Sequence, residues 1–217
     1  DVFDHLTDYL DKSGFDENKP TIGLLYHGGM HYDQTTYVTK AFLGRLGGQV
    51  HIIPVFAGSS DALEAMEKLF IRDGEAVIDA VVHFRWFRLN GGPFGGDPEP
   101  TLKLLQKMNV PVFAPAPMYM REVDKWKESG TGLSPIEIIT AVVLPELDGC
   151  IEPVPSCGLD DLKAAEGSQL RIKEVTAIED RIDRIAGRIN KWLKLQQKTN
   201  HEKKIAFILY DYPPGED

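Results

Sequence analysis

Cysteine is scarce in this sequence. The 217 residues include only Cys150 and Cys157, which lie seven positions apart beside prolines. Two cysteines are too few for the disulfide framework that stabilises small secreted domains, so that class of protein is excluded. The low cysteine content fits a reducing compartment, and we expect a cytoplasmic protein.

Long apolar runs are missing as well. The longest runs, Thr21–Tyr26 and Ala76–Val82, are far shorter than the roughly 20 residues that a membrane-spanning helix needs. No basic segment followed by an apolar run opens the sequence, so we expect no signal peptide. We also expect no membrane span.

Positive charge is in deficit. The chain has 24 Lys and Arg against 33 Asp and Glu, a formal net charge of −9. A general nucleic-acid binder needs clustered basic residues for its phosphate contacts, so we expect no nucleic-acid partner. Only residues 171–204 depart from this balance, with ten basic and five acidic residues. That basic stretch is either a solvated helix face or a surface on which a partner subunit docks.

Familiar catalytic and nucleotide-binding motifs are not found. The glycine-rich segment Asn90–Asp97 lacks the order Gly-x-x-x-x-Gly-Lys-Ser/Thr, and the first strand is not followed by Gly-x-Gly-x-x-Gly. Gly-x-Ser-x-Gly is absent, and neither cysteine has a base nearby in sequence. Nucleotide binding and nucleophilic hydrolysis are therefore not predicted.

Strands and helices alternate through the first half of the chain. Short apolar runs that end at Gly or Pro predict strands, and segments of helical periodicity between them predict helices. The predicted strands are Ile22–Tyr26, His51–Phe56, Ala76–Trp86 and Val110–Ala114, and the predicted helices are Thr35–Leu46, Asp61–Ile71 (with Ser60 as N-cap) and Pro100–Met108. This pattern predicts an α/β fold with a doubly wound, mostly parallel sheet, Rossmann- or flavodoxin-like, in three layers. Such sheets bind ligands at the carboxyl ends of their strands, here the loops 27–34, 57–60, 86–97 and 115–121.

The second half is less regular. We expect helices from Arg121 to Ser129 and, after a capping box at Ser134 and Glu137, toward Leu144, where Pro145 should end or kink the helix. A loop should cover 149–167. Glu174–Gln197 should form a long amphipathic helix, and Lys204–Tyr212 a last strand. The predicted organisation is an N-terminal segment (1–20), an α/β domain (21–150), a loop (151–173) and a helix plus strand (174–217) leading into a following domain.

Two groups of residues could carry chemistry. His27 and His31 lie four apart in a loop and could ligate a transition metal, although two histidines in a turn more often serve as hydrogen-bonding residues. The segment His83–Arg88 joins aromatic and cationic side chains, which suits a planar anionic ligand, but it also fits a buried aromatic strand. The candidate ligand-binding residues are His31, His83, Arg85, Trp86, Arg88 and Asn90, and the candidate metal ligands are His27 and His31. No catalytic residue is assigned.

Several motifs resemble one protein family in their order along the chain. They are Ile53-Pro-Val-Phe-Ala-Gly58, Val81–Phe87 with Leu89-Asn-Gly-Gly-Pro93, Asn109-Val-Pro-Val112, Trp126 with Gly132-Leu-Ser-Pro135, Val143-Leu-Pro-Glu-Leu-Asp-Gly149, and Glu202-Lys-Lys-Ile-Ala206 before Tyr212-Pro-Pro-Gly215. Through these motifs the chain resembles the large, tetrapyrrole-binding subunit of the ATP-dependent magnesium chelatases and cobaltochelatases. We expect it to be an internal part of such a subunit.

The resemblance implies a role in inserting Mg²⁺ into protoporphyrin IX or Co²⁺ into a corrin ring, as a multi-subunit ligase. It implies a tetrapyrrole as ligand and two partner subunits, an AAA+ ATPase that hydrolyses ATP and a bridging subunit. We expect no cofactor on this part of the chain and no activity from it alone. In the resemblance His31 matches a histidine of the loop after the first strand, and Asn90-Gly-Gly-Pro93 favours the magnesium branch. The alternatives from the residues alone are a stand-alone ligand-binding or docking module and a small ATP-independent chelatase.

Overall fold

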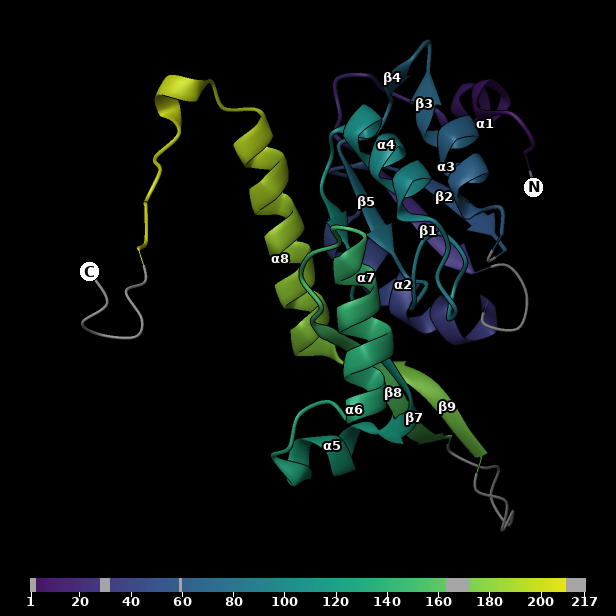
Figure 1. The fold of residues 1–217 in the computed structure, drawn as a ribbon, viewed down its shortest axis with the longest axis vertical. Coiled ribbons are helices and arrows are strands. Elements are labelled where there is room, and N and C mark those ends of the chain that lie inside the picture. The colour runs from purple at the N-terminus through teal and green to yellow at the C-terminus, as the bar shows by residue number, and fades with distance from the viewer. Residues whose placement is uncertain (1–2, 28–31, 59, 163–171, 210–217) are drawn as a thin grey trace.

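A computed structural model describes residues 3–27, 32–58, 60–162 and 172–209 (Figure 1). Its central feature is a four-stranded parallel sheet of order β2-β1-β5-β6. The strands are β1 (Thr21–His27), β2 (His51–Ala57), β5 (Ala80–His83) and β6 (Val112–Phe113). The predicted parallel sheet is thus confirmed, and all four carboxyl ends lie at one edge.

Two predicted strands are shorter than expected. Residues near Ala76 instead form a small antiparallel hairpin of β3 (Ile71–Arg72) and β4 (Glu75–Ala76). The turn residues Asp73 and Gly74 both have positive φ, the conformation that two-residue hairpin turns favour. Beyond β5 the backbone leaves the sheet, and β6 keeps only two of its five predicted residues.

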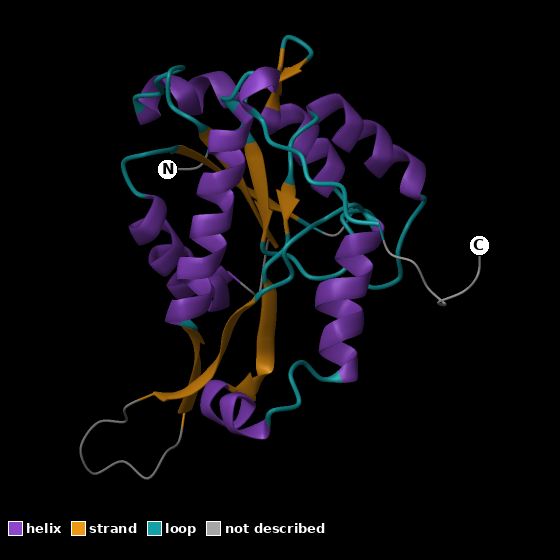
Figure 2. Cartoon of the chain, turned by 90° about the vertical axis from the view of Figure 1, so that its left-hand side faces the viewer, coloured by secondary structure: helices purple, strands orange, loops and turns teal. Residues whose placement is uncertain are grey.

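Helices cover both faces of the sheet (Figure 2). One face packs against α1 (Leu6–Ser13), α3 (Ala62–Phe70) and α4 (Pro98–Met108), and the other against α2 (Tyr32–Leu46) and α8 (Glu179–Gln196). Ile22, Leu24 and Tyr26 of β1 point to the α2 and α8 side, whereas Leu25 points to the other, as alternation along a strand requires. The three-layer prediction is confirmed. No helix in the described part of the chain is long and apolar enough to cross a membrane.

Gly23 of β1 is required by its neighbour. A Cβ built at this position would lie 2.6 Å from the ring of Phe70, which ends α3 and is fully buried. Only glycine lets the aromatic ring lie directly on the strand. The contact fixes the height of α3 above the sheet.

A second sheet lies below the first and was not predicted from the sequence (Figure 1). Its strands β7 (Ala116–Glu122), β8 (Pro155–Leu162) and β9 (Ile172–Ala177) follow the order β7-β8-β9, parallel then antiparallel. The loop expected at 115–121 is therefore wrong, and the loop expected at 149–167 is confirmed over 149–154 and wrong over 155–162, while 163–167 lie outside the described residues. The long helix begins at Glu179 instead of Glu174. The helix predicted from Arg121 is α5 (Val123–Ser129).

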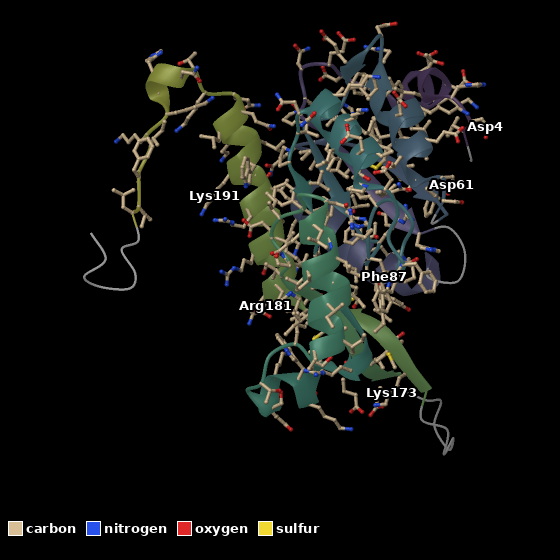
Figure 3. All side chains as sticks on the ribbon, viewed as in Figure 1. Asp4, Asp61, Phe87, Lys173, Arg181 and Lys191 are labelled. Atoms are coloured by element: carbon tan, nitrogen blue, oxygen red, sulfur yellow. The ribbon has the colours of Figure 1, made fainter. Side chains whose placement is uncertain are left out.

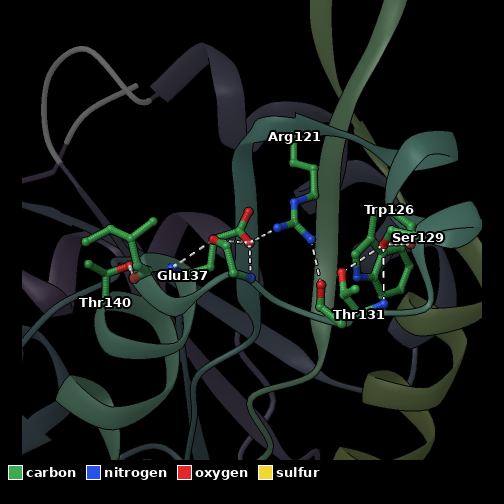
Figure 4. A network of polar contacts seen from close by, with 9 residues as sticks. Arg121, Trp126, Ser129, Thr131, Glu137 and Thr140 are labelled. Atoms are coloured by element: carbon green, nitrogen blue, oxygen red, sulfur yellow. Dashed lines mark hydrogen bonds and ion pairs between the residues drawn. The ribbon is translucent and has the colours of Figure 1, made fainter.

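The helix after Ser134 begins as predicted but continues past the position where Pro145 was expected to end or kink it. The capping box is confirmed, since Ser134 Oγ accepts from the Glu137 amide while the Glu137 carboxylate accepts from the Ser134 amide at 2.7 Å. Figure 4 shows the same carboxylate contacting Arg121, at 3.3 Å. Pro145, however, does not end the helix: α6 (Pro135–Ile138) passes through a π-helical turn, η1 (Ile139–Val143), into α7 (Leu144–Leu147). The wider turn accommodates a proline that would clash with a regular α-helical carbonyl.

Two more local predictions are wrong. The N-cap of α3 is Asp61 instead of Ser60, and its side chain makes no capping hydrogen bond. Residues 203–209 follow a short 3₁₀ turn, η2 (Asn200–Glu202), without forming a strand, and Phe207 and Leu209 are exposed. The rest of that predicted strand lies outside the described residues. The domain boundaries themselves stay a prediction.

Candidate functional site

The carboxyl edge of the main sheet is the candidate site. β1 ends at His27, β2 at Ala57 and β5 at His83, so the loops that follow meet at this edge. In parallel α/β sheets this edge is where ligands bind. The segment 83–90, which carries most of the sequence-predicted residues, follows β5 at this edge, and Figure 3 labels Phe87 within it.

His83 and Arg85 are both buried, with exposed fractions of 1% and 2%. Arg85 donates from Nη2 to the Gly58 carbonyl oxygen at 2.8 Å, and the Arg85 amide donates to His83 Nδ1 at 3.3 Å. Within the described residues, His83 Nε2 and Arg85 Nε and Nη1 have no hydrogen-bond partner. Buried polar atoms are rarely left in this state, so these atoms mark the edge as more than a packed core.

Burial also shifts the ionisation of both side chains. Loss of solvation, followed by the nearby charge of Arg85, lowers the pKa of His83 to about 3, so its imidazole is neutral at neutral pH. Loss of solvation lowers the pKa of Arg85 to about 10, with Asp61 acting in the opposite direction. Arg85 is still a cation at neutral pH, and no ion pair joins it to a carboxylate of the described residues.

Arg88 has a different environment from Arg85. Its Nε and Nη2 both lie 2.6 Å from Asp148 Oδ1, and the Leu89 amide donates to Asp148 Oδ2 at 2.6 Å. Asp148 is 1% exposed. The pair fixes the backbone that follows β5 to the end of α7, and a ligand-binding role for Arg88 stays a prediction.

Asn90 closes the glycine-rich loop. Its Nδ2 donates to the Asp97 carbonyl oxygen at 2.9 Å. Gly91 has a φ of +80°, and a Cβ there would lie 2.5 Å from the backbone of Gly95, so only glycine fits. These contacts assign Asn90 a structural role, while direct contact with a ligand stays a prediction.

Trp86 belongs to an aromatic group at the same edge. Its ring stacks on Phe87, with centroids 5.4 Å apart, and lies 4.8 Å from Tyr119 of β7. Phe87 has a φ of +69°, which is rare for a bulky residue, and its amide donates to the Thr140 carbonyl oxygen at 2.8 Å. A strained backbone held by a neighbouring helix is typical of sites that must present a particular surface. Burial raises the pKa of Tyr119, which keeps its phenol neutral.

The histidine pair is only partly described. His27 ends β1 and is half-buried, whereas His31 lies outside the described residues. Among the residues that the structure describes, no group of three or more His, Cys, Asp or Glu could hold a metal ion. A metal site at His27 and His31 therefore stays a prediction.

Sequence reasoning did not identify the residues that surround the two arginines of this edge. Gly58 and Asp61 surround the Arg85 guanidinium, and Asp148 neutralises Arg88. Gly58 lies in the loop 57–60 that the sequence predicts at the ligand-binding edge, and Gly58 and Asp148 each stand in a motif of the family resemblance. Their contacts are 27 and 60 residues away in sequence, so no local pattern could show them.

Comparison with known proteins identifies the family. The CobN/Magnesium Chelatase family model matches residues 1–217. The chain belongs to this family. The magnesium-chelatase subunit ChlH of rice (Oryza sativa subsp. indica) is 30% identical over 226 residues, which cover 98% of this chain. The aerobic cobaltochelatase subunit CobN of Pseudomonas aeruginosa is 27% identical over 93% of the chain.

A solved structure supports the fold of this chelatase-family chain. The catalytic subunit of cobaltochelatase from Mycobacterium tuberculosis has a TM-score of 0.56 and 22% identity over 78% of the chain. The match covers 14% of that protein, and the chain spans 16% of the rice subunit. The predicted family and the α/β fold are therefore confirmed, and the matched region is a small part of each relative.

Proposed function

We propose that this chain is part of the tetrapyrrole-binding subunit of a chelatase that inserts Mg²⁺ into protoporphyrin IX or Co²⁺ into a corrin ring. The observation that carries the proposal is the family match over the whole chain, with relatives named for both metals. ATP would be hydrolysed by an AAA+ partner, and a bridging subunit would connect the two. In cells we place the complex in the cytoplasm.

The carboxyl edge would supply one wall of the macrocycle site. Trp86, Phe87 and Tyr119 present aromatic faces, on which a planar tetrapyrrole can stack. Arg85 places positive charge beside them, which suits a carboxylate of such a ring, whereas the charge of Arg88 is paired with Asp148. Metal insertion also needs a distorted ring, a base for the two pyrrole protons and an ordered approach of the ion. Because Mg²⁺ loses its water reluctantly, coupling to ATP in a partner has a physical reason.

A second contribution would be partner docking. α8 has its buried face on the sheet, through Ile182, Ile185 and Ile189, and turns basic residues such as Lys191 and Lys194 to solvent. An exposed basic face on an otherwise acidic protein can steer an acidic partner surface.

The test is a fluorescence titration of the chain with protoporphyrin IX and with a metal-free corrinoid. Trp86, Trp126 and Trp192 are the reporters, and Trp86→Phe and Trp126→Phe locate the quenched residue. We expect saturable quenching by one ring, lost in Trp86→Phe but kept in Trp126→Phe, and that ring assigns the metal branch. If neither ring quenches the fluorescence, this chain does not supply a wall of the macrocycle site.

A further inference from the structure

Two features that attract anions lie close together at the carboxyl edge: the N-terminus of α3 and the Arg85 side chain, which follows β5. Arg85 extends past β1 to the loop after β2, where its Nη2 donates to the Gly58 carbonyl oxygen. Gly58 lies three residues before Asp61, the N-cap of α3, and a Cβ on Gly58 would be 2.8 Å from Asp61 Oδ1. The guanidinium therefore lies beside the N-terminus of a nine-residue helix.

This helix N-terminus has free donors of its own. The first helical hydrogen bond runs from the Ala65 amide to the Asp61 carbonyl oxygen at 2.9 Å, so the preceding amides have no acceptor within the helix. The Asp61 side chain does not cap them. Unsatisfied amides and the helix dipole together make such an end attractive to anions.

The guanidinium provides the independent observation. Its Nε and Nη1 are buried and have no partner among the described residues, although the side chain carries a full charge. Asp61 is the carboxylate that acts on this charge, but the two side chains form no ion pair. Asp61 and Glu64 at the start of α3 also line a cleft of about 470 Å³, together with Asp4 and Lys68. Arg85 does not line this cleft, so the anion position proposed below lies outside it. The unmatched positive charge is concentrated at Arg85.

We propose that Arg85 and the first turn of α3 form an oxyanion subsite, which binds a carboxylate or phosphate group. The identity of the anion rests on the proposed function: if the chain binds a tetrapyrrole, the group is a carboxylate side chain of that ring. The ring itself would then extend toward Trp86 and Phe87, which follow directly in the chain.

An unfilled subsite of this kind lowers the stability of the free protein. A buried guanidinium without a partner is unfavourable, and replacing it with an apolar side chain of similar length removes that disadvantage. Arg85→Met should therefore raise the melting temperature of the free chain. A purely structural arginine would behave in the opposite way, because its loss would remove a stabilising contact.

The first experiment measures thermal unfolding in inorganic phosphate against chloride at matched ionic strength. We expect phosphate to raise the melting temperature of the wild-type chain by about 4 °C near saturation, and to leave Arg85→Met unchanged. Arg85→Lys should keep part of the effect, because it retains the charge without the planar donors. Asp61→Asn, which removes the competing carboxylate, should strengthen it. A lower melting temperature for Arg85→Met, with no phosphate effect on the wild type, would overturn the subsite.

The second experiment compares protoporphyrin IX with its dimethyl ester, which has the same ring but no carboxylates. If the ring supplies the anion, the free acid should bind roughly tenfold more tightly than the ester, and Arg85→Met should abolish the difference. If phosphate stabilises the chain but the acid and the ester bind equally well, the ligand of the subsite is free phosphate and not a carboxylate of the ring. Phosphate stabilisation without binding of either ring would refute the proposed function alone. Equal ring binding with no anion effect would refute the subsite alone.

Discussion

Asp148 connects two distant parts of the candidate site, and its removal should be strongly destabilising. Both of its oxygens are used: Oδ1 contacts the Arg88 guanidinium and Oδ2 accepts from the Leu89 amide, all at 2.6 Å. The Asp148 side chain is 1% exposed and that of Arg88 is 12% exposed. Asp148→Ala would therefore leave a largely buried cation and a buried amide without acceptors.

The expected magnitude follows from these two losses. Breaking a buried ion pair from one side costs about 3–5 kcal/mol, and an unsatisfied buried amide costs about 1–3 kcal/mol. Because the losses share one carboxylate and water can enter the gap, we expect a total of about 4 kcal/mol. For a chain of 217 residues this corresponds to a fall in melting temperature of about 8–16 °C. Asp148→Asn should lose roughly half as much, since one oxygen acceptor remains.

Urea unfolding followed by far-ultraviolet circular dichroism measures the effect. The double variant Asp148→Ala/Arg88→Met should be more stable than the sum of the single changes predicts by about 1 kcal/mol or more, because the orphaned cation is gone. Glu17→Ala, which breaks the exposed pair with Arg72, is the matched control and should cost less than about 1 kcal/mol. A value for Asp148→Ala as small as that of the control would refute the reasoning.

Three further predictions concern the core. The pKa of His83 is about 3 in the folded state against 6.5 in the unfolded state, so the unfolded state binds more protons between these values. The free energy of unfolding should therefore fall as the pH drops from about 6.5 toward 3. His83→Gln should flatten this part of the plot of unfolding free energy against pH. Burial raises the pKa of Cys150 and Cys157, so a colorimetric thiol assay should detect neither in the native chain and both in urea. Gly23→Ala should destabilise by about 1–3 kcal/mol in the same urea assay, and Phe70→Leu should relieve part of that loss.

Elements with their own apolar pattern could be predicted from the sequence. β1 is buried on both faces, so residues 21–26 read as an unbroken run of mostly apolar residues, which local propensity recognises as a strand. Likewise Ala62, Met66 and Phe70 repeat at helical spacing and form the buried face of α3. In these segments the signal that drives burial is contained within a few consecutive residues.

β8 shows why other elements could not be predicted. Its sequence from Pro155 to Leu162 contains three charged or hydroxyl side chains and a glycine, and it has no regular alternation. It becomes a strand because β7 and β9 supply hydrogen bonds on both sides, for example where Cys157 pairs with Ala177 and Pro117. Gly158 then lies under Val123, where a Cβ would be 2.8 Å from the valine methyl. Partners that far away in sequence override a weak local preference.

The candidate site shows the same limit at the level of single charges. Arg85 and Arg88 lie three residues apart in one aromatic segment, and nothing in that segment distinguishes them. The two arginines are distinguished by Asp148, which lies 60 residues beyond Arg88. Its two carboxylate oxygens accept from Arg88 and from the Leu89 amide, so Asp148 has no acceptor left for Arg85. Among the described residues, Arg85 instead contacts a carbonyl oxygen, a partner without a charge to offset its own. The chemical difference between a structural arginine and one suited to an anionic ligand thus arises from the fold, because it depends on which cation a distant carboxylate reaches.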